Sequence, residues 1–495
     1  MSNSLDYDVI VIGAGGAALV AAVAARNEGA RVLVLEKSPK ELRSGNCRFA
    51  GATCKFWHRG LPEILEFLPD LTPDEAQSMI VPEFSADAFY NKIMEVTEER
   101  ADPKLAEILV TESNPTVRWL KAQGVKFEVA SNKMFSVQEG NRLHWKPEHI
   151  VIRAKGGGMG LSDSLSAIGE QKGVQTLYDT QAVELLVDAT GRVCGVTVKG
   201  KDGFKDIKSK SVVLACGGFE SNREWRARYL GAGWDMVRPR GTRFNTGDGL
   251  RMAMEIGAQA AGHWSGCHAT AIGYDLSRVP EGEDIGGLDH RSNDYNVGIE
   301  VNANGMRFLD EGEDYTAFVY GKYGAPILQQ PQWIAWQIFD AKVAHLMQEE
   351  FRGRGSTAVT ANSIEELAGE LNMPALITTI NEFNDAVQEC VPLNYLIRDG
   401  RGTVGITPPK SNWAQKIDKP PFLAYPVGCG ITYTYGGLKI NTRAQVLDTE
   451  GQVIPGLYAT GEIVGGVWFK NYVGGGGVML GEVFGRISGA NAAAD

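Results

Sequence analysis

Short apolar runs separated by glycine open the chain. The run at 8–12, Asp-Val-Ile-Val-Ile, predicts a buried parallel strand, and the alanine-rich stretch beyond the next glycines predicts a helix to about Arg26. Gly29 follows at the position of a C-terminal helix cap, and the apolar run at 31–36 predicts a second strand. Together these elements predict a βαβ unit.

Downstream, the hydrophobic pattern predicts helices over most of 60–147. One of them covers 104–123, ends at Gly124, and is expected to kink or break at Pro115. Later helices are expected from about Ser162, at 337–351 and at 363–389, and strands at 149–153, 174–178, 182–187, 193–198 and from Ser211 into the glycine turn 217–218. The segment 438–493 predicts strand, turn, strand, glycine loop and helix.

The pattern changes after about residue 270, where glycine, aspartate and asparagine become dense and the apolar runs shorten. The simplest organisation is therefore an α/β domain that is interrupted by an α+β insertion at roughly 270–410. We predict the division 1–269, 270–411 and 412–495, in which the first and third parts form one discontinuous Rossmann-like domain.

Composition and charge narrow the classes of function. Glycine makes up 60 of 495 residues, against an average of about 7%, so tight turns or backbone close to a ligand are expected. The net charge of −11 excludes nucleic acid and anionic membranes as partners, but not small anions. The seven cysteines and seven histidines have neither disulfide nor metal spacing. No transmembrane segment or targeting signal is expected, and a cytoplasmic location is the prediction.

A glycine motif lies between the first strand and the first helix. Gly13-x-Gly15-x-x-Ala18 allows a tight turn, close approach of a pyrophosphate and close helix packing, and Glu36 ends the next strand, where it can bind a ribose. This arrangement predicts dinucleotide binding without separating FAD from NAD. The segment 455–462, Pro-Gly-Leu-Tyr-Ala-Thr-Gly-Glu, favours FAD because it predicts a late strand that delivers a glycine turn and a carboxylate.

A second glycine motif leaves an alternative open. Gly156-x-Gly158-x-x-Leu161, with Asp179 after a predicted strand, could bind NAD(P)H beside a flavin. It lacks the third small residue, so a second loop of the flavin domain is the favoured interpretation.

Several segments together resemble the fumarate reductase/succinate dehydrogenase flavoprotein superfamily. They include GAGGAA, LEKSPKELRSGN, VVLACGGF, NTGDGLRMAMEIGA, PGLYATGE and GGGGVMLGEVFGRISG, and they cover nearly the whole chain. WSGCHA, GMRFLDEGEDY, TPPKSNWAQ and CGITYTYGGL are most similar to the tricarballylate dehydrogenase branch. The resemblance implies non-covalent FAD in a discontinuous domain, with an inserted capping domain over the substrate.

The resemblance also assigns residues to FAD. The pyrophosphate would contact Gly13, Ala14, Gly15, Gly16, Ala17 and Ala18, with Ala215 and Cys216 in the turn above it; Glu36 and Lys37 would bind the adenosine ribose and Ala182 the adenine. The flavin would be lined by Ser44, Gly45, Asn46 and Cys47, the ribityl chain reached by Asp248 and Glu462, and the pyrimidine end by Gly477, Val478 and Met479. Cys47 replaces the serine that is usual in relatives.

Three positions depart from fumarate reductases. Tyr433 stands where they have histidine, Tyr315 where they have a proton-donating arginine, and Tyr472 where they have a carboxylate-binding arginine. Fumarate reduction is therefore not expected. The pattern is similar to 3-ketosteroid dehydrogenases, which implies Tyr315 as base or proton relay, and the Tyr472 hydroxyl with the Gly476 N–H as an oxygen-binding pair.

A basic run beside the NTGDG motif suits an acidic substrate, because arginine binds carboxylates through two hydrogen bonds. The run comprises Arg238, Arg240, Arg243 and Arg251. Arg48 and Arg243 are the substrate candidates, and no metal ligand is expected. Cys47 and Cys54 flank the flavin loop, where a redox pair is an alternative to small core residues.

These observations predict an FAD-dependent dehydrogenase that forms a C=C bond beside a carboxylate or ketone, with tricarballylate-like acids favoured. The alternatives are a desaturase of a cyclic or steroid-like ketone and a non-catalytic electron-relay subunit. An arginine-lined cavity would favour acids, whereas an aromatic one, drawing on Tyr320, Tyr323, Trp333 or Trp336, would favour ketones. Reoxidation requires an external acceptor, namely a quinone, oxygen or an iron–sulfur partner protein.

Overall fold

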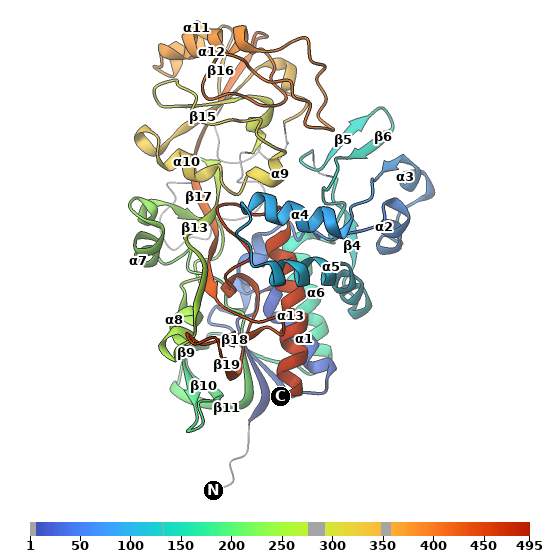
Figure 1. Ribbon diagram of the computed structural model, residues 1–495, viewed down its shortest axis with the longest axis vertical. Helices are drawn as coiled ribbons and strands as arrows, with labels where there is room; N and C mark the ends of the chain where they lie inside the picture. Colours follow the sequence, from blue (N-terminus) through green and yellow to red (C-terminus); the bar gives the residue numbers. More distant parts are fainter. Residues whose placement is uncertain (1–5, 132, 276–292, 348–357) are drawn as a thin grey trace.

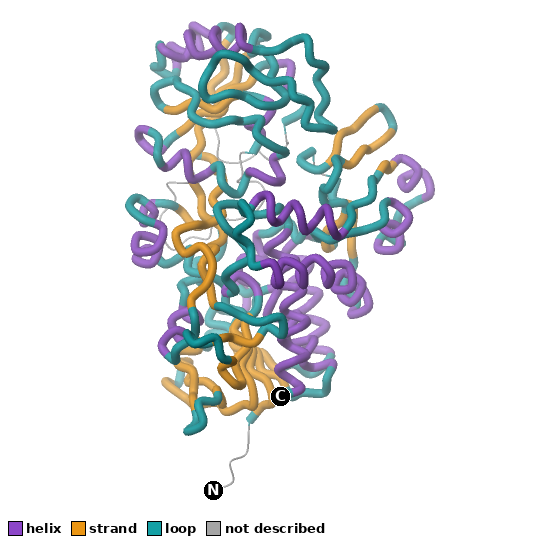
Figure 2. The backbone as a smooth tube through the Cα atoms, in the orientation of Figure 1, coloured by secondary structure: helices purple, strands orange, loops and turns teal. Residues whose placement is uncertain are grey.

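The computed structural model describes residues 6–131, 133–275, 293–347 and 358–495. A parallel sheet with its helices lies at one end of the long axis, and the short helices and strands of the insertion lie at the other (Figure 1). Long strands run between the two ends, as Figure 2 shows in orange.

The first sheet is the Rossmann-like core. Its order is β18 (Gln445–Leu447), β19 (Val453–Ala459), β11 (Gly203–Leu214), β1 (Tyr7–Ile12), β2 (Val32–Leu35) and β8 (Gln175–Leu177), and β10 (Val193–Gly200) joins β9 (Gln181–Val187) to β11. The strands from β19 to β8 pair in parallel. Residues 9–12 are all buried, because both faces of β1 are covered: Val9 and Val11 belong to the cluster that holds the alanines of the helix after β1, and Ile10 and Ile12 to the cluster that includes residues of β9 and β10. The predicted first strand, helix and second strand are confirmed.

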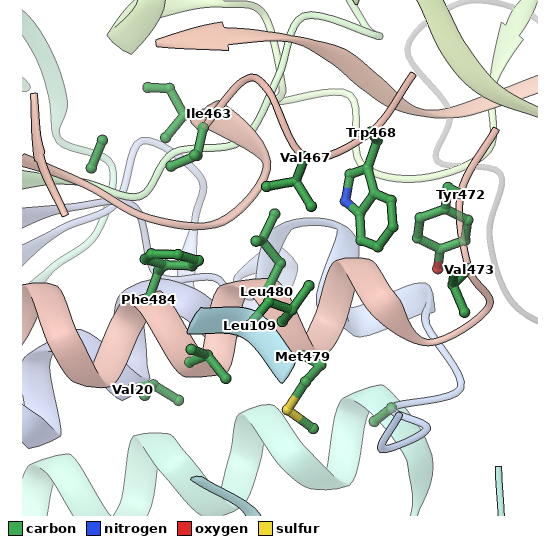
Figure 3. Packing of buried hydrophobic residues seen from close by; sticks show 14 of the residues in the cluster. Val20, Leu109, Ile463, Val467, Trp468, Tyr472, Val473, Met479, Leu480 and Phe484 are labelled. Carbon is green, nitrogen blue, oxygen red and sulfur yellow. The ribbon is translucent and has the colours of Figure 1, made fainter. Parts of the chain in front are cut away.

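Three long helices pack beside this sheet: α1 (Gly16–Asn27), α6 (Gly157–Gln171) and α13 (Gly476–Ala494), and α5 (Pro103–Gln123) packs on α13. The side chains of Met479, Leu480 and Phe484 on α13 enter a core that also holds Val20 and Leu109 (Figure 3). α5 ends at Gly124, with φ +112°, as predicted, but it continues through Pro115 without a break.

Glycines let α13 approach α1 closely. A Cβ at Gly489 would lie 2.1 Å from the Ala21 carbonyl oxygen. Gly489→Ala should therefore lower the free energy of unfolding by about 1–3 kcal/mol, the usual cost of overpacking. The control is Gly369→Ala in α11 (Ile364–Glu370), where a Cβ meets nothing within 4 Å, and where alanine should be neutral or stabilising by up to about 1 kcal/mol. Equal urea midpoints for the two variants would contradict this packing.

The second sheet links the two ends of the molecule. Its order is β12 (Arg238–Pro239), β17 (Phe422–Leu438), β15 (Ala335–Phe339) and β14 (Ile299–Asn302), and β13 (Ala260–Gly273) and β16 (Val359–Ala361) also pair with β17. α9 (Thr316–Val319), α10 (Gly324–Leu328), α11 and α12 (Ala375–Ala386) surround its far half. Because β13 crosses residue 269 and β17 follows residue 411, this sheet spans both predicted boundaries, and the division into domains stays a prediction.

The remaining elements precede α6 or connect the two sheets. They are α2 (Leu61–Phe67), α3 (Pro73–Ser78), α4 (Ala86–Val96), β3 (Met79–Ile80), β4 (Phe127–Val129), β5 (Ser136–Glu139), β6 (Arg142–Trp145), β7 (Ile152–Ala154), α7 (Arg223–Trp225) and α8 (Asp248–Glu255).

Some sequence-based elements are wrong. The region 127–145 holds three strands where helix was expected. The expected helix at 337–351 begins inside β15, which pairs with β17 and is buried in the sheet, and its last part, 348–351, lies outside the described residues. The expected helix at 363–389 is two helices, because the chain turns before Pro374 at the start of α12. α6 begins at Gly157, five residues before Ser162. The predicted α/β class is confirmed.

Candidate active site

A cavity of about 370 Å³ follows the carboxyl ends of β1, β2 and β11 to the start of α13 and the middle of β17. Ligands of doubly wound sheets bind at such strand ends. The cavity begins at the turn from β1 to α1. Gly13 has φ +102° there, and a Cβ at this position would lie 2.6 Å from the Ala215 carbonyl oxygen, so only glycine fits.

The walls of the turn leave space for a ligand. A Cβ on Gly15 would meet only the Ser44 carbonyl oxygen at 3.6 Å, and one on Gly45 would meet only the Gly15 Cα at 3.9 Å. Both glycines line the cavity at the N-terminus of α1, where the helix dipole favours anions. The two backbones therefore form a cradle that a side chain would fill.

Glu36 and Lys37 line the same end of the cavity. The Glu36 carboxylate accepts hydrogen bonds from the N–H groups of Ala14 and Ser38, both at 2.8 Å. Lys37 Nζ contacts Asp248 Oδ2 at 2.7 Å. Asp248 thus lies beside Lys37, while Glu462 lies farther along the cavity beside Thr434, whose N–H donates to Glu462 Oε1 at 2.8 Å.

A buried carboxyl pair supports the flavin loop. Asn46 Nδ2 donates to Glu220 Oε1 at 2.5 Å, and Thr242 N–H donates to Asn46 Oδ1 at 2.9 Å. Burial raises the pKa of both Glu220 and Glu462, and the two carboxyl groups interact directly. A proton shared between them relieves the repulsion of two buried charges. Sequence analysis missed Glu220, although it directly follows the predicted Gly-Gly-Phe turn.

Most predicted cofactor residues lie along this one cavity. Its lining includes Gly13, Ala14, Gly15, Gly16, Ala17, Glu36, Lys37, Gly45, Asn46, Cys47, Ala182, Ala215, Cys216, Asp248, Glu462, Gly477 and Val478. Ala18 and Met479 are instead fully buried in the core, and Ser44 is buried with φ +89° beside the lining. The Gly476 N–H donates to the Val473 carbonyl at 2.8 Å.

The second glycine motif packs against the flavin loop. Gly158 N–H donates to the Ala50 carbonyl at 3.0 Å, and a Cβ on Gly158 would lie 1.7 Å from the Cys47 carbonyl oxygen. Leu161 lines the cavity. These contacts favour a second loop of one dinucleotide site over a separate nicotinamide site.

Aromatic side chains close the far end of the cavity. The Tyr320 hydroxyl donates to the Tyr472 hydroxyl at 3.4 Å, and the ring of His268 packs edge-on against both at 4.8 and 4.9 Å. Tyr433 lies next to them, with its ring centroid 6.2 Å from that of Tyr472. Burial raises the pKa of Tyr472 well above its ordinary value, so this hydroxyl keeps its proton at neutral pH.

Tyr315 lies outside the described cavity lining. Its hydroxyl donates to the Leu396 carbonyl at 2.9 Å, and its ring packs against His149 and Trp413. Burial and the neighbouring Asp314 raise the pKa of Tyr315 to about 12. The structure therefore brings Tyr472, Tyr433 and Tyr320 together but not Tyr315.

The arginine at the aromatic end is Arg240, which is buried and lines the cavity. Its Nε donates to Thr432 Oγ1 at 3.0 Å, and its backbone N–H donates to the Ile431 carbonyl of β17 at 2.6 Å. The two substrate candidates lie elsewhere: Arg48 donates to the Glu41 carbonyl at 2.5 Å, and the Arg243 guanidinium lies over the Phe244 ring. In the sequence, Arg240 is identified only as one of the four arginines of the basic run beside the NTGDG motif.

The family model for the FAD binding domain matches residues 8–478. The chain belongs to this FAD-binding family. A probable fumarate reductase of Shewanella frigidimarina, Ifc3, is 30% identical over 98% of this chain and 74% of its own length. The open conformation of a flavocytochrome c3 fumarate reductase covers all of this chain and 79% of its own, with 28% identity and a TM-score of 0.71. The 3-ketosteroid Δ1-dehydrogenase of Sterolibacterium denitrificans shares the fold, with a TM-score of 0.73, 21% identity and 99% coverage of both chains.

These comparisons confirm the predicted superfamily, the FAD-binding domain with a capping domain, and FAD as the cofactor. This member of the fumarate reductase flavoprotein superfamily is an FAD-dependent oxidoreductase that acts on CH–CH groups. The glycine cradle and the buried, unpartnered Glu482 Oε2 in the cavity wall fit such a cofactor. Within the described ranges, no helix is long and apolar enough to cross a membrane.

Proposed function

We propose that the chain desaturates an organic acid, with a tricarballylate-like substrate favoured, by forming a C=C bond beside a carboxylate. The observation that carries this proposal is the buried Arg240 in the wall that also holds Tyr320 and Tyr472. A guanidinium keeps its charge when buried and binds a carboxylate through two parallel hydrogen bonds. An acid anchored there presents its neighbouring carbons to the tyrosine pair.

The tyrosine pair moves the proton. FAD, when bound, supplies the hydride acceptor. Tyr320 takes the proton from the substrate carbon, and its own proton passes to Tyr472, whose oxygen accepts its hydrogen bond. Tyr472 in turn gives its proton to the substrate oxygen, so that no buried charge remains on the pair. The raised pKa of Tyr472 keeps its hydroxyl protonated at neutral pH, so a proton is present there to be passed on as the proton from Tyr320 arrives.

A cyclic ketone is the second candidate. Tyr433, Tyr472 and Tyr320 form an aromatic wall, and Met134 and Phe135 line the same cavity. Such a wall fits a flat ring, with the Tyr472 hydroxyl directed at a ketone oxygen. The electron acceptor in either case is external, and a quinone, oxygen or an iron–sulfur partner protein would serve; a cytoplasmic location stays a prediction.

Anaerobic bleaching of bound flavin separates the two candidates. The wild-type protein is mixed with a panel of tricarboxylic and dicarboxylic acids and of cyclic ketones, and absorbance of the oxidised flavin is followed. We expect bleaching by acids that carry a CH–CH unit next to a carboxylate. Bleaching by ketones alone would overturn the acid proposal.

A further inference from the structure

One carboxyl group in the cavity wall has no partner. Glu482 lies on α13 and is 2% exposed, and its Oε2 is buried without a hydrogen bond. It lines the cavity together with Gly16, Ala17 and Cys47. Neither the sequence motifs nor the tyrosine relay gives it a role.

The packing of α13 places this carboxyl group at the start of α1. A Cβ on the preceding Gly481 would lie 3.0 Å from the Ala17 Cβ, so the two helices touch at this level. A Cβ on Gly16 would lie equally close, 3.0 Å, to the Cys47 Sγ. Glu482 is therefore next to the glycine cradle, on the side of the flavin loop.

No described basic group offsets a charge on Glu482. The titratable groups that respond to it are the Cys47 and Cys54 thiols, and a charge on Glu482 raises the pKa of both. Ser162 on α6 lies beside the Cys47 thiol, and its buried hydroxyl has no hydrogen-bond partner among the described residues. Burial alone raises the pKa of Glu482 to about 8. At neutral pH this side chain is thus a carboxylic acid with one O–H to donate.

We propose that Glu482 binds FAD as a neutral acid, by donating a hydrogen bond to an oxygen of the cofactor beside the glycine cradle. A pyrophosphate is an acceptor with negative charge, so it favours an O–H donor and repels a carboxylate. The adjacent Cys47 thiol is only a weak donor and cannot replace this bond. FAD binding and protonation of Glu482 are therefore linked.

The linkage fixes the direction of the pH effect. Below about pH 8 Glu482 is protonated in the apoprotein and FAD affinity is independent of this group. Above that pH the protonated fraction of Glu482 falls tenfold per pH unit. The dissociation constant of FAD then rises by up to tenfold per pH unit. Binding above pH 8 must then take up a proton.

The test is fluorescence titration of the apoprotein with FAD between pH 6.5 and 9.5. We expect the dissociation constant of the wild type to rise about tenfold from pH 8.5 to 9.5, and that of Glu482→Gln to lack this rise. The matched control is Glu300→Gln: Glu300 is also a buried carboxyl whose pKa burial raises to about 8, but it is bonded to Gln337 outside the cavity lining. This control should follow the wild type. A Glu482→Gln curve parallel to that of the wild type would overturn the proposal.

A second measurement needs only the wild type. Calorimetric FAD titrations in two buffers of different ionisation enthalpy give the number of protons taken up on binding. We expect uptake at pH 9 and none from Glu482 at pH 7. The Glu220–Glu462 pair titrates in both proteins, so the difference between wild type and Glu482→Gln isolates Glu482. No proton uptake by the wild type at pH 9 would refute the linkage even if the variant failed to fold.

Discussion

Tyr320→Phe should lower kcat by about 10²–10⁴-fold with little change in KM, because general acid–base groups contribute rate enhancements of that size. The variant keeps the ring that packs against His268 and removes only the hydroxyl that faces Tyr472. Stopped-flow bleaching of bound flavin by the acid substrate measures the loss directly. A solvent isotope effect on the wild-type rate is expected to disappear from the residual rate, because the relay is broken.

Tyr315→Phe is the matched control for this prediction. Its hydroxyl is held by the Leu396 carbonyl rather than by the cavity, so its loss should change turnover by less than a few-fold. The sequence comparison with 3-ketosteroid dehydrogenases places the base at Tyr315 instead. A large loss at Tyr315 together with a small one at Tyr320 would restore that assignment and refute ours.

Local sequence patterns identify the cofactor end of the site because its residues lie next to glycine turns. The first turn needs positive φ at Gly13, and Glu36 directly follows the adjacent strand β2, so spacing along the chain is enough to place both near a dinucleotide. The cap of α5 at Gly124 is likewise a local feature with its own residue signature.

The substrate end depends on pairing between distant strands. His268 on β13 lies opposite Tyr433 on β17, and Arg240 reaches the cavity because its backbone bonds to Ile431 of the same strand. No spacing along the chain encodes these contacts, which join residues far apart in sequence. The same cause explains the error at 337–351: a short apolar segment suits a helix or a buried strand equally well, and pairing with β17 decides.

Arg240→Gln should reduce kcat/KM for the acid substrate by about 10²–10⁴-fold, since losing one partner of a buried charge pair costs about 3–5 kcal/mol. The effect should appear mainly in KM, because the arginine holds the carboxylate before and after proton transfer. Arg240→Lys, which keeps the charge but loses the planar fork, should recover part of the loss.

Arg243→Gln serves as the control for Arg240. It removes the same charge three residues away, from a side chain that does not line the cavity but lies over the ring of Phe244, which does. General electrostatic attraction of the acid would weaken both variants alike, whereas a specific anchor weakens only Arg240→Gln. Steady-state kinetics at two salt concentrations separates these cases, because a buried contact is screened much less than a surface charge. Unchanged kinetics of Arg240→Gln with acids, alongside turnover of a cyclic ketone, would assign the cavity to the ketone class.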